Sequence, residues 1–241
     1  MTNKKVLAAR REAKRKAQQT RYVQIAGVGI VLLLVAVGIW QFWPKEADVV
    51  DIPVADKGDQ TACEPFADIP AAEQYDEPPM RIDTAKQYFA TVKMAAGGEF
   101  VMQLYPDKAP TTVNSFVFLA CKGYFDGVTF HRVLEGFMAQ GGDPTGTGSG
   151  GPGYKFKYEG SDLTFDKAGV VAMANTGPAT PTNGSQFFIT FGSTPQLNDG
   201  YTIFGQVING MDVVNGITRR DPLANPTFPG DAMESVTISV Q

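Results

Sequence analysis

Seven short runs of β-type residues, separated by turn residues, restrict what this chain can fold into more than any other feature of its sequence. The first two runs, 87–94 and 99–104, flank AAGG and predict a β-hairpin. Glycine-rich connections join the later runs, so many short strands predict a mainly β protein, either a barrel or a sandwich. In chain order the runs read QYFATVKM, EFVMQL, VTFHRV, GVVAMA, SQFFIT, TIFGQV and SVTISV.

Two segments between these runs have helical patterns instead. The longer one begins at Pro110 and ends before Gly123, which are typical start and stop residues of a helix. Its apolar residues recur at positions i, i+3, i+4 and i+7, which predicts an amphipathic helix. The shorter one, GMDVVNGI, covers residues 210–217. The apolar positions of the longer helix are Val113, Phe116, Val117 and Ala120.

An almost uncharged apolar run, residues 22–43, precedes all of these elements. As a helix it would be roughly 33 Å long, which matches the hydrocarbon thickness of a bilayer. Residues 1–21 hold eight Lys or Arg against one Glu, so the positive-inside rule places this basic tail in the cytoplasm. We therefore expect a single-pass transmembrane helix with the rest of the chain outside the cytoplasm. A cleaved signal peptide is the alternative, although Trp43-Pro44-Lys45-Glu46 does not resemble a cleavage site.

Residues 44–80 have the composition of an extended linker, with six prolines and ten acidic residues against two lysines. The linker would connect the membrane helix to a folded domain over residues 81–241. The basic tail could also bind nucleic acid. However, the chain after residue 44 carries 13 basic and 24 acidic residues, and this acidic body argues against a nucleic-acid partner.

The two cysteines, Cys63 and Cys121, lie on the predicted extracytoplasmic side, where a disulfide is permitted. A bond between them would close a loop of about 57 residues and stabilise the fold by roughly 4 kcal/mol in the chain-entropy model. Two unpaired buried thiols are the alternative, because sequence does not reveal the geometry.

A nucleotide site is the first interpretation of the glycine-rich segment. Gly146, Gly148 and Gly151 satisfy the pattern G-x-G-x-x-G. That fingerprint needs a strand before it and a helix after it, whereas GGDPT precedes and the proline-containing GPGYKFKY follows. We therefore interpret these glycines as a surface loop.

A hydrolase or a metal site would depend on His131, the only histidine. Alternation along a strand places His131 and Arg132 on opposite faces, and a lone histidine among apolar residues is more often part of the core. No second histidine or cysteine cluster accompanies it, so the sequence predicts neither a metal nor a cofactor.

Arg132 remains as the candidate for chemistry, because apolar and amide side chains accompany it in the sequence and in later strands. A surface charge beside ordinary core aromatics is the alternative interpretation. The apolar companions are Phe137, Met138, Phe187, Phe188 and Leu197, and the amides are Gln140, Asn175 and Gln186.

Several ordered blocks resemble the cyclophilins, the peptidyl-prolyl cis/trans isomerases, over about residues 87–240. The blocks are APTTVNSFVFLACKGYFDG, FHRVLEGFMAQGGDPTGTGSGGPG, AMANTGP, NGSQFFIT and IFGQVINGMDVV. The resemblance implies an eight-stranded antiparallel β-barrel capped by two α-helices, here preceded by one transmembrane helix, with a groove on one outer face as the active site. The segments before the match resemble those of membrane-tethered cyclophilins of Gram-positive bacteria.

The resemblance also assigns roles. Arg132 matches the arginine that stabilises the twisted amide, and Phe137 and Gln140 join it as catalytic residues. His131 is structural in this pattern. The residues implied to form the apolar proline pocket are Phe137, Met138, Phe188 and Leu197. The residues implied to contact the substrate backbone or line the groove are Gln140, Gly146, Ala174, Asn175, Asn183, Gln186 and Tyr201.

Two positions depart from the pattern of many eukaryotic members. Gln196 stands where they carry a tryptophan that contributes to cyclosporin binding, so we expect weak cyclosporin binding. Tyr201 replaces a pocket histidine and can complete an apolar wall. The sequence thus predicts a membrane-anchored isomerase that accelerates X–Pro isomerisation in exported polypeptides. The alternative is a tethered chaperone or scaffold that binds proline-containing segments without significant turnover.

Overall fold

The computed structural model describes residues 62–177, 179–224 and 226–241. The predicted basic tail, the predicted transmembrane helix 22–43 and residues 44–61 of the predicted linker lie outside these ranges. Among the helices that are described, none combines the length and the apolar character that crossing a bilayer requires.

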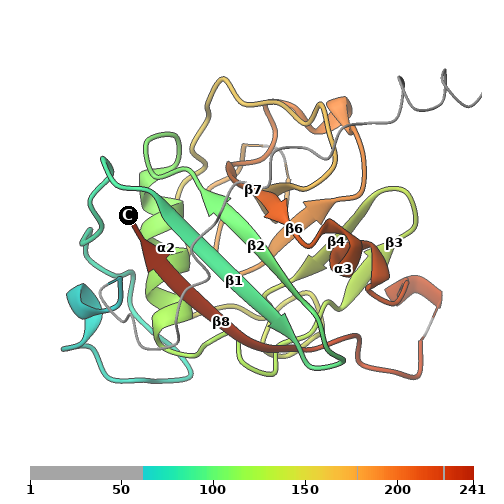
Figure 1. Ribbon diagram of the computed structural model, residues 1–241, viewed down its shortest axis with the longest axis horizontal. Helices are drawn as coiled ribbons and strands as arrows, with labels where there is room; N and C mark the ends of the chain where they lie inside the picture. Colours follow the sequence, from blue (N-terminus) through green and yellow to red (C-terminus); the bar gives the residue numbers. More distant parts are fainter. Residues whose placement is uncertain (1–61, 178, 225) are drawn as a thin grey trace, which may run out of the picture. The chain divides into compact units, whose positions relative to one another are not determined.

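The folded unit is mainly β, with eight strands in one antiparallel sheet (Figure 1). Their order across the sheet is β3-β4-β6-β5-β7-β2-β1-β8. The predicted hairpin is present, because β1 and β2 pair from Tyr88 opposite Leu104 to Lys93 opposite Glu99. The strands are β1 (Tyr88–Met94), β2 (Glu99–Leu104), β3 (Arg132–Leu134), β4 (Met138–Gly141), β5 (Val170–Met173), β6 (Phe187–Thr190), β7 (Ile203–Asn209) and β8 (Met233–Val240).

The sheet forms a half-barrel, where the resemblance implied an eight-stranded antiparallel barrel. Its edge strands β3 and β8 do not share a ladder; the segments before them meet instead through a single bridge between Thr129 and Ala232. Phe130 N–H also donates to the Asp231 carbonyl at 2.9 Å.

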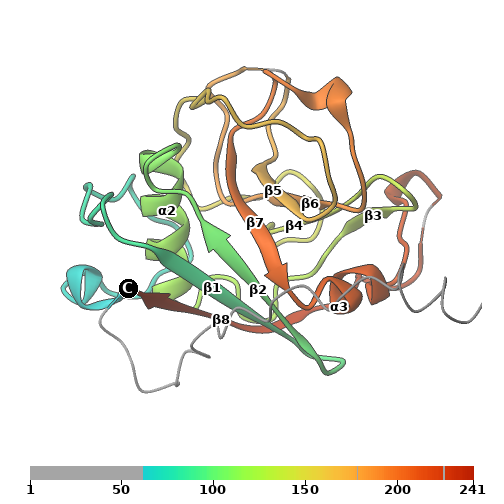
Figure 2. The ribbon, with the colours of Figure 1, turned by 45° about the horizontal axis from the view of Figure 1, so that its top comes forward.

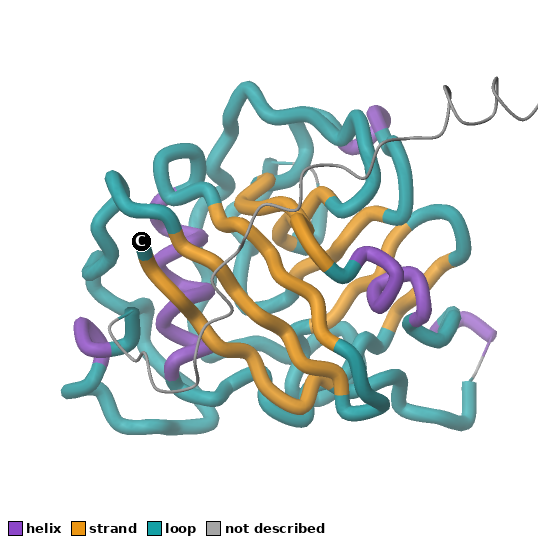
Figure 3. The backbone as a smooth tube through the Cα atoms, in the orientation of Figure 1, coloured by secondary structure: helices purple, strands orange, loops and turns teal. Residues whose placement is uncertain are grey.

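Two α-helices accompany the sheet, α2 (Pro110–Cys121) and the six-residue α3 (Met211–Gly216). Helix α2 lies near β1 and β8, and α3 lies beyond the end of β7, as Figures 2 and 3 show. Three 3₁₀ turns complete the described elements: η1 (Glu64–Phe66), η2 (Pro195–Leu197) and η3 (Pro222–Ala224).

Helix α2 is buried more completely than an amphipathic helix. All nine residues from Thr112 to Ala120 are buried, including polar ones. Thr112 is bonded to Glu159 and Ser115 to Tyr154, and a further segment covers the helix at Asn114. Its start is capped by a distant carboxylate: Glu159 accepts hydrogen bonds from the N–H groups of Thr111 and Thr112 at 2.9 and 2.8 Å. This satisfies backbone donors that Ala109, at the cap position, leaves unpaired.

The covering segment is residues 62–80, which we call the strap. Phe66 is fully buried and packs on Phe118 of α2 with 5.4 Å between ring centroids. The structure joins Cys63 and Cys121 in a disulfide, with 5.3 Å between their Cα atoms. The proline and acidic content of this segment predicted an extended linker, but Phe66 and Cys63 attach it to the folded unit.

Phenylalanines fill the core between α2 and the sheet. Phe116 stacks on Phe125 at 5.0 Å and contacts Phe187 edge-to-face at 5.6 Å and Phe204 at 5.4 Å. Each such pair adds about 0.5–1.5 kcal/mol beyond area burial. This core occupies one side of the sheet, so the opposite face of β3, β4, β6 and β5 can carry a site.

Candidate active site

The site is built on a row of residues that face one another across four strands. Arg132 pairs with Gln140 between β3 and β4, Gln140 pairs with Phe188 of β6, and Phe188 pairs with Ala172 of β5. Directly opposed residues point to the same side of a sheet. Their neighbours Val133, Ala139 and Phe187 belong to the core cluster on the other side.

An apolar pocket of about 310 Å³ lies over this row. Phe188 forms its floor and is supported by Phe165, which stacks on it at 5.9 Å, and by Tyr201, which meets it edge-on at 5.4 Å. Phe165 is fully buried and was not identified from the sequence. The lining residues are Arg132, Phe137, Met138, Gln140, Ala174, Asn175, Phe188, Leu197 and Tyr201.

Arg132 is the only cationic residue in the lining of this pocket. Its Nη1 lies 3.4 Å from Gln140 Oε1 and 3.7 Å from the sulfur of Met138, and its guanidinium carbon is 6.0 Å from the Phe137 ring centroid. None of the salt bridges in the described part of the chain includes Arg132. The charge is therefore not neutralised by a neighbouring carboxylate, and it adjoins an apolar surface.

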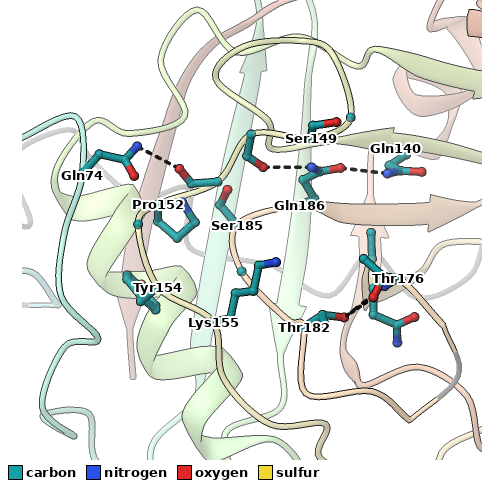
Figure 4. A pocket seen from close by; sticks show the side chains of 17 residues that line it. Gln74, Gln140, Ser149, Pro152, Tyr154, Lys155, Thr176, Thr182, Ser185 and Gln186 are labelled. Carbon is teal, nitrogen blue, oxygen red and sulfur yellow. Dashed lines mark hydrogen bonds between the residues drawn. The ribbon is translucent and has the colours of Figure 1, made fainter.

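A chain of amide hydrogen bonds continues from Arg132. Gln140 Nε2 donates to Gln186 Oε1 at 3.0 Å, and Gln186 Nε2 donates to the Gly150 carbonyl at 2.9 Å (Figure 4). These bonds orient Gln140 so that its Oε1 faces the guanidinium. The row thus has a fixed polar edge beside its apolar floor.

Ala174 and Asn175 form the rim on the β5 side. The Ala174 N–H donates to the Gln186 carbonyl at 2.9 Å, and Asn175 Nδ2 donates to the Gly200 carbonyl at 3.0 Å. Asn175 thereby connects this rim to the loop that carries Leu197 and Tyr201.

A second pocket of about 590 Å³, lined mainly by glycines and polar side chains, adjoins the first and shares Gln140, Ala174 and Asn175 with it. Figure 4 shows this second pocket, with Gln186 near its centre and Lys155 pointing into it. Its other lining residues are Gln74, Gly148, Ser149, Gly150, Gly151, Pro152, Gly153, Tyr154, Thr176, Thr182, Gly184 and Ser185.

The glycine-rich loop along this pocket is organised by a buried carboxylate. Asp143 accepts hydrogen bonds from the N–H groups of Gly148 and Gly150 at 2.6 and 3.1 Å, and from Thr145 at 2.8 Å. Burial raises the pKa of Asp143, but these hydrogen bonds outweigh burial, so the net pKa lies below the usual value. The loop is a turn around a side chain, which explains the glycines without a nucleotide.

Several positions differ from the sequence interpretation. Gly146 lines neither pocket, and Gly148 lines the second pocket instead. Asn183 is fully buried, and its Nδ2 donates a hydrogen bond to the Thr202 hydroxyl at 3.1 Å, so it is structural. Phe187 lies in the core. His131, by contrast, agrees with the structural role predicted for it, because it is only 2% exposed and burial lowers its pKa.

The remaining groove residues that the resemblance implied lie together in the structure. The first pocket collects Arg132, Phe137, Met138, Gln140, Ala174, Asn175, Phe188, Leu197 and Tyr201, and Gln186 lines the second. Within the described ranges, no group of three or more metal-ligating side chains occurs.

Comparison with known proteins agrees with this architecture. The family described as cyclophilin type peptidyl-prolyl cis-trans isomerase/CLD matches residues 89–238. Peptidyl-prolyl cis-trans isomerase A of Mycobacterium tuberculosis is 50% identical, with 59% of this chain and 87% of the relative covered. A peptidyl-prolyl cis-trans isomerase of Schizosaccharomyces pombe is 46% identical, with 58% of this chain and 94% of the relative covered.

Solved structures show the same likeness. A crystal structure of a cyclophilin type peptidyl-prolyl cis-trans isomerase from Cryptosporidium parvum has a TM-score of 0.56 and 35% identity, covering 64% of this chain and 98% of that chain. A second structure of that protein, obtained in the presence of the dipeptide Ala-Pro, has a TM-score of 0.54 and 34% identity, with 63% and 98% covered. The family match, these relatives and the half-barrel fold together establish that the chain belongs to the cyclophilin family of peptidyl-prolyl cis-trans isomerases.

Proposed function

We propose that this cyclophilin accelerates the cis–trans isomerisation of X–Pro bonds without a covalent step, with Arg132 stabilising the twisted amide. The observation that carries this proposal is the position of Arg132, a cation without a carboxylate partner in the described residues, at the edge of the apolar pocket.

The physical argument begins with the barrier. Rotation about an X–Pro bond breaks amide resonance and costs about 20 kcal/mol. As the bond twists, the prolyl nitrogen regains a lone pair, so a donor directed at this nitrogen binds the transition state more tightly than either ground state. Guanidinium suits this role because its donors lie in a rigid plane and its charge is permanent. A donor of this kind is worth about 3–4 kcal/mol when water is excluded.

The other residues hold the substrate. The pocket formed by Phe137, Met138, Phe188 and Leu197 fits a proline ring, which becomes the fixed side of the rotation. Gln140 and Asn175 provide polar groups for the substrate backbone, and the second pocket receives residues that precede the proline. The Ala-Pro dipeptide used with the Cryptosporidium parvum protein supports X–Pro as the ligand class.

We further propose that the protein is the membrane-anchored form and acts on exported polypeptides outside the cytoplasm. The apolar run 22–43, the basic tail before it and the Cys63–Cys121 bond support this location, because disulfides persist mainly in oxidising compartments. Proline-limited folding takes tens of seconds or longer without a catalyst, so exported proteins would benefit. Membrane fractionation separates this proposal from a secreted soluble form.

The test is isomerisation of a proline peptide by the full-length protein and by Arg132→Ala. We expect kcat/KM to fall about 100- to 1,000-fold, the range found when one transition-state donor is deleted. Binding of the peptide is measured in parallel. If Arg132→Ala retains the wild-type rate, the mechanism is wrong, and if the wild type binds without turnover, the protein is the binding chaperone instead. We also expect weak cyclosporin binding, because Gln196 is exposed and does not line either pocket.

A further inference from the structure

The strap reaches the second pocket through Gln74. This residue lies before residues 89–238, which the family match covers, yet its side chain lines the pocket. Gln74 Nε2 donates to the Gly151 carbonyl at 3.1 Å and to the Glu73 carbonyl at 3.0 Å. Figure 4 shows Gln74 at one side of the pocket, with Thr176 and Thr182 at the other.

The contact between the strap and the glycine-rich loop is close. The Tyr75 N–H donates to the Pro152 carbonyl at 2.7 Å. The next loop residue, Gly153, has φ of +101°, and a Cβ there would lie 2.7 Å from Tyr75 O and 3.0 Å from Gln74 Oε1. A side chain at Gly153 would therefore push the strap away from the pocket.

Anchors on both sides of Gln74 hold the strap in this position. On the carboxyl side, the Tyr75 ring packs edge-on against Phe118 at 4.9 Å between centroids. On the amino side, Phe66 is fully buried, its carbonyl accepts a hydrogen bond from Lys122 Nζ at 2.6 Å, and Cys63 is bonded to Cys121. The position of Gln74 thus depends on the disulfide-bonded strap.

The free hydrogen-bonding groups around the second pocket indicate which substrate side chain would fit it. Both N–H groups of Gln74 are used by carbonyls, whereas no donor among the described residues reaches Gln74 Oε1, which is left as an acceptor. Lys155 supplies donors, and none of the lining residues is acidic. A carboxamide side chain presents one donor group and one acceptor group, so it can satisfy both. A carboxylate would place an acceptor against Gln74 Oε1.

We propose that the strap is part of the substrate-binding surface and that Gln74 is a specificity-determining residue of the second pocket. It favours substrates with a glutamine or asparagine side chain two places before the proline. This inference rests on the proposed function, in which the residues preceding the proline enter the second pocket.

The experiment measures kcat/KM of the full-length protein on peptides that differ only in that residue: Gln, Glu, Leu or Ala. Wild type is expected to prefer Gln over Leu. Gln74→Met keeps the size but removes the Oε1 acceptor and also the Nε2 donor that binds the Gly151 carbonyl. Loss of the acceptor is expected to reduce the Gln-to-Leu ratio about fivefold, the value of one neutral hydrogen bond. Glu73→Gln is the matched control, because Glu73 is an exposed strap residue that does not line the pocket, and it should keep the wild-type ratio.

A second arm tests the anchoring. The double variant Cys63→Ser and Cys121→Ser, or reduction by dithiothreitol, is expected to lower the same ratio in the same direction as Gln74→Met. In the reduction the disulfide gains two electrons and two protons and becomes two thiols, while dithiothreitol becomes its cyclic disulfide. A wild-type ratio after either treatment overturns the anchoring role.

The outcomes separate this inference from the proposed function. If turnover is absent, or does not depend on Arg132, the proposed function fails. If turnover depends on Arg132 but the Gln-to-Leu ratio is the same in wild type and Gln74→Met, only the role of Gln74 is refuted. A wild type that prefers Glu over Gln refutes the carboxamide preference.

Discussion

Removing the disulfide is expected to destabilise the folded domain mainly through its unfolded state. Cys63 and Cys121 are 58 positions apart, and cross-linking a loop of that length removes chain entropy worth about 4 kcal/mol at 25 °C. On the folded side the change should be confined to the strap, which keeps its hydrogen bonds to Lys122 and Asn114 but loses the covalent link that holds its amino end. The double variant Cys63→Ser and Cys121→Ser should therefore lose up to about 4 kcal/mol of unfolding free energy.

The assay has to report on the domain itself. Both tryptophans, Trp40 and Trp43, precede the described residues, so tryptophan fluorescence is a poor probe of this fold. Pulse proteolysis in urea reports the fraction of folded domain instead. With an m-value of about 2 kcal/mol/M, the midpoint should fall by roughly 2 M.

The m-value shows whether the disulfide acts on the unfolded chain or on the folded domain. Because the uncrosslinked unfolded chain exposes more surface, the m-value should increase in the double variant. Wild type with reductant is the control and should match the variant. A loss below about 1 kcal/mol with an unchanged m-value would refute the loop-entropy argument.

Two further predictions concern the pocket floor and the buried histidine. Phe165→Leu removes the ring that stacks on Phe188, so we expect KM to rise severalfold with a smaller change in kcat, and stability to fall by about 1 kcal/mol; steady-state kinetics and urea unfolding check this. Burial lowers the pKa of His131 below 6.5, so below that pH the unfolded chain binds a proton that the folded chain does not. Unfolding free energy should therefore decrease on acidification by up to about 1.4 kcal/mol per pH unit, and His131→Gln should reduce this slope in unfolding curves at pH 7.5 and 5.5.

Short sequence patterns predicted correctly those strands and helices that depend on neighbouring residues. The hairpin of β1 and β2 follows from two β-rich runs around AAGG, and α2 begins at Pro110 and ends before Gly123 as its signals indicate. Strand β4 was not predicted, because Met138–Gly141 is four residues long and contains no β-branched residue. It is a strand because β3 and β6 pair with it on either side.

The arrangement of the site residues could not be predicted from any short stretch of the sequence. The roles of Arg132, Gln140 and Phe188 came from a family resemblance, and only the register of three strands explains why they face one pocket. The resemblance implied that Gly146 lines the groove, whereas in the structure Gly148 lines the second pocket and its N–H is bonded to Asp143.

The strap is the most informative difference between sequence and structure. Its prolines and acidic residues are typical of a solvated linker, and composition alone gives no reason for it to pack. Two contacts nevertheless hold the strap on the folded unit: Phe66 packs on α2, and the disulfide fixes the segment there. Since the strap covers Asn114, while Glu159 and Tyr154 bond to Thr112 and Ser115, the helix is not amphipathic in the folded protein. The same packing brings Gln74 to the second pocket, so a segment outside the matched family region contributes to the surface that a substrate would contact.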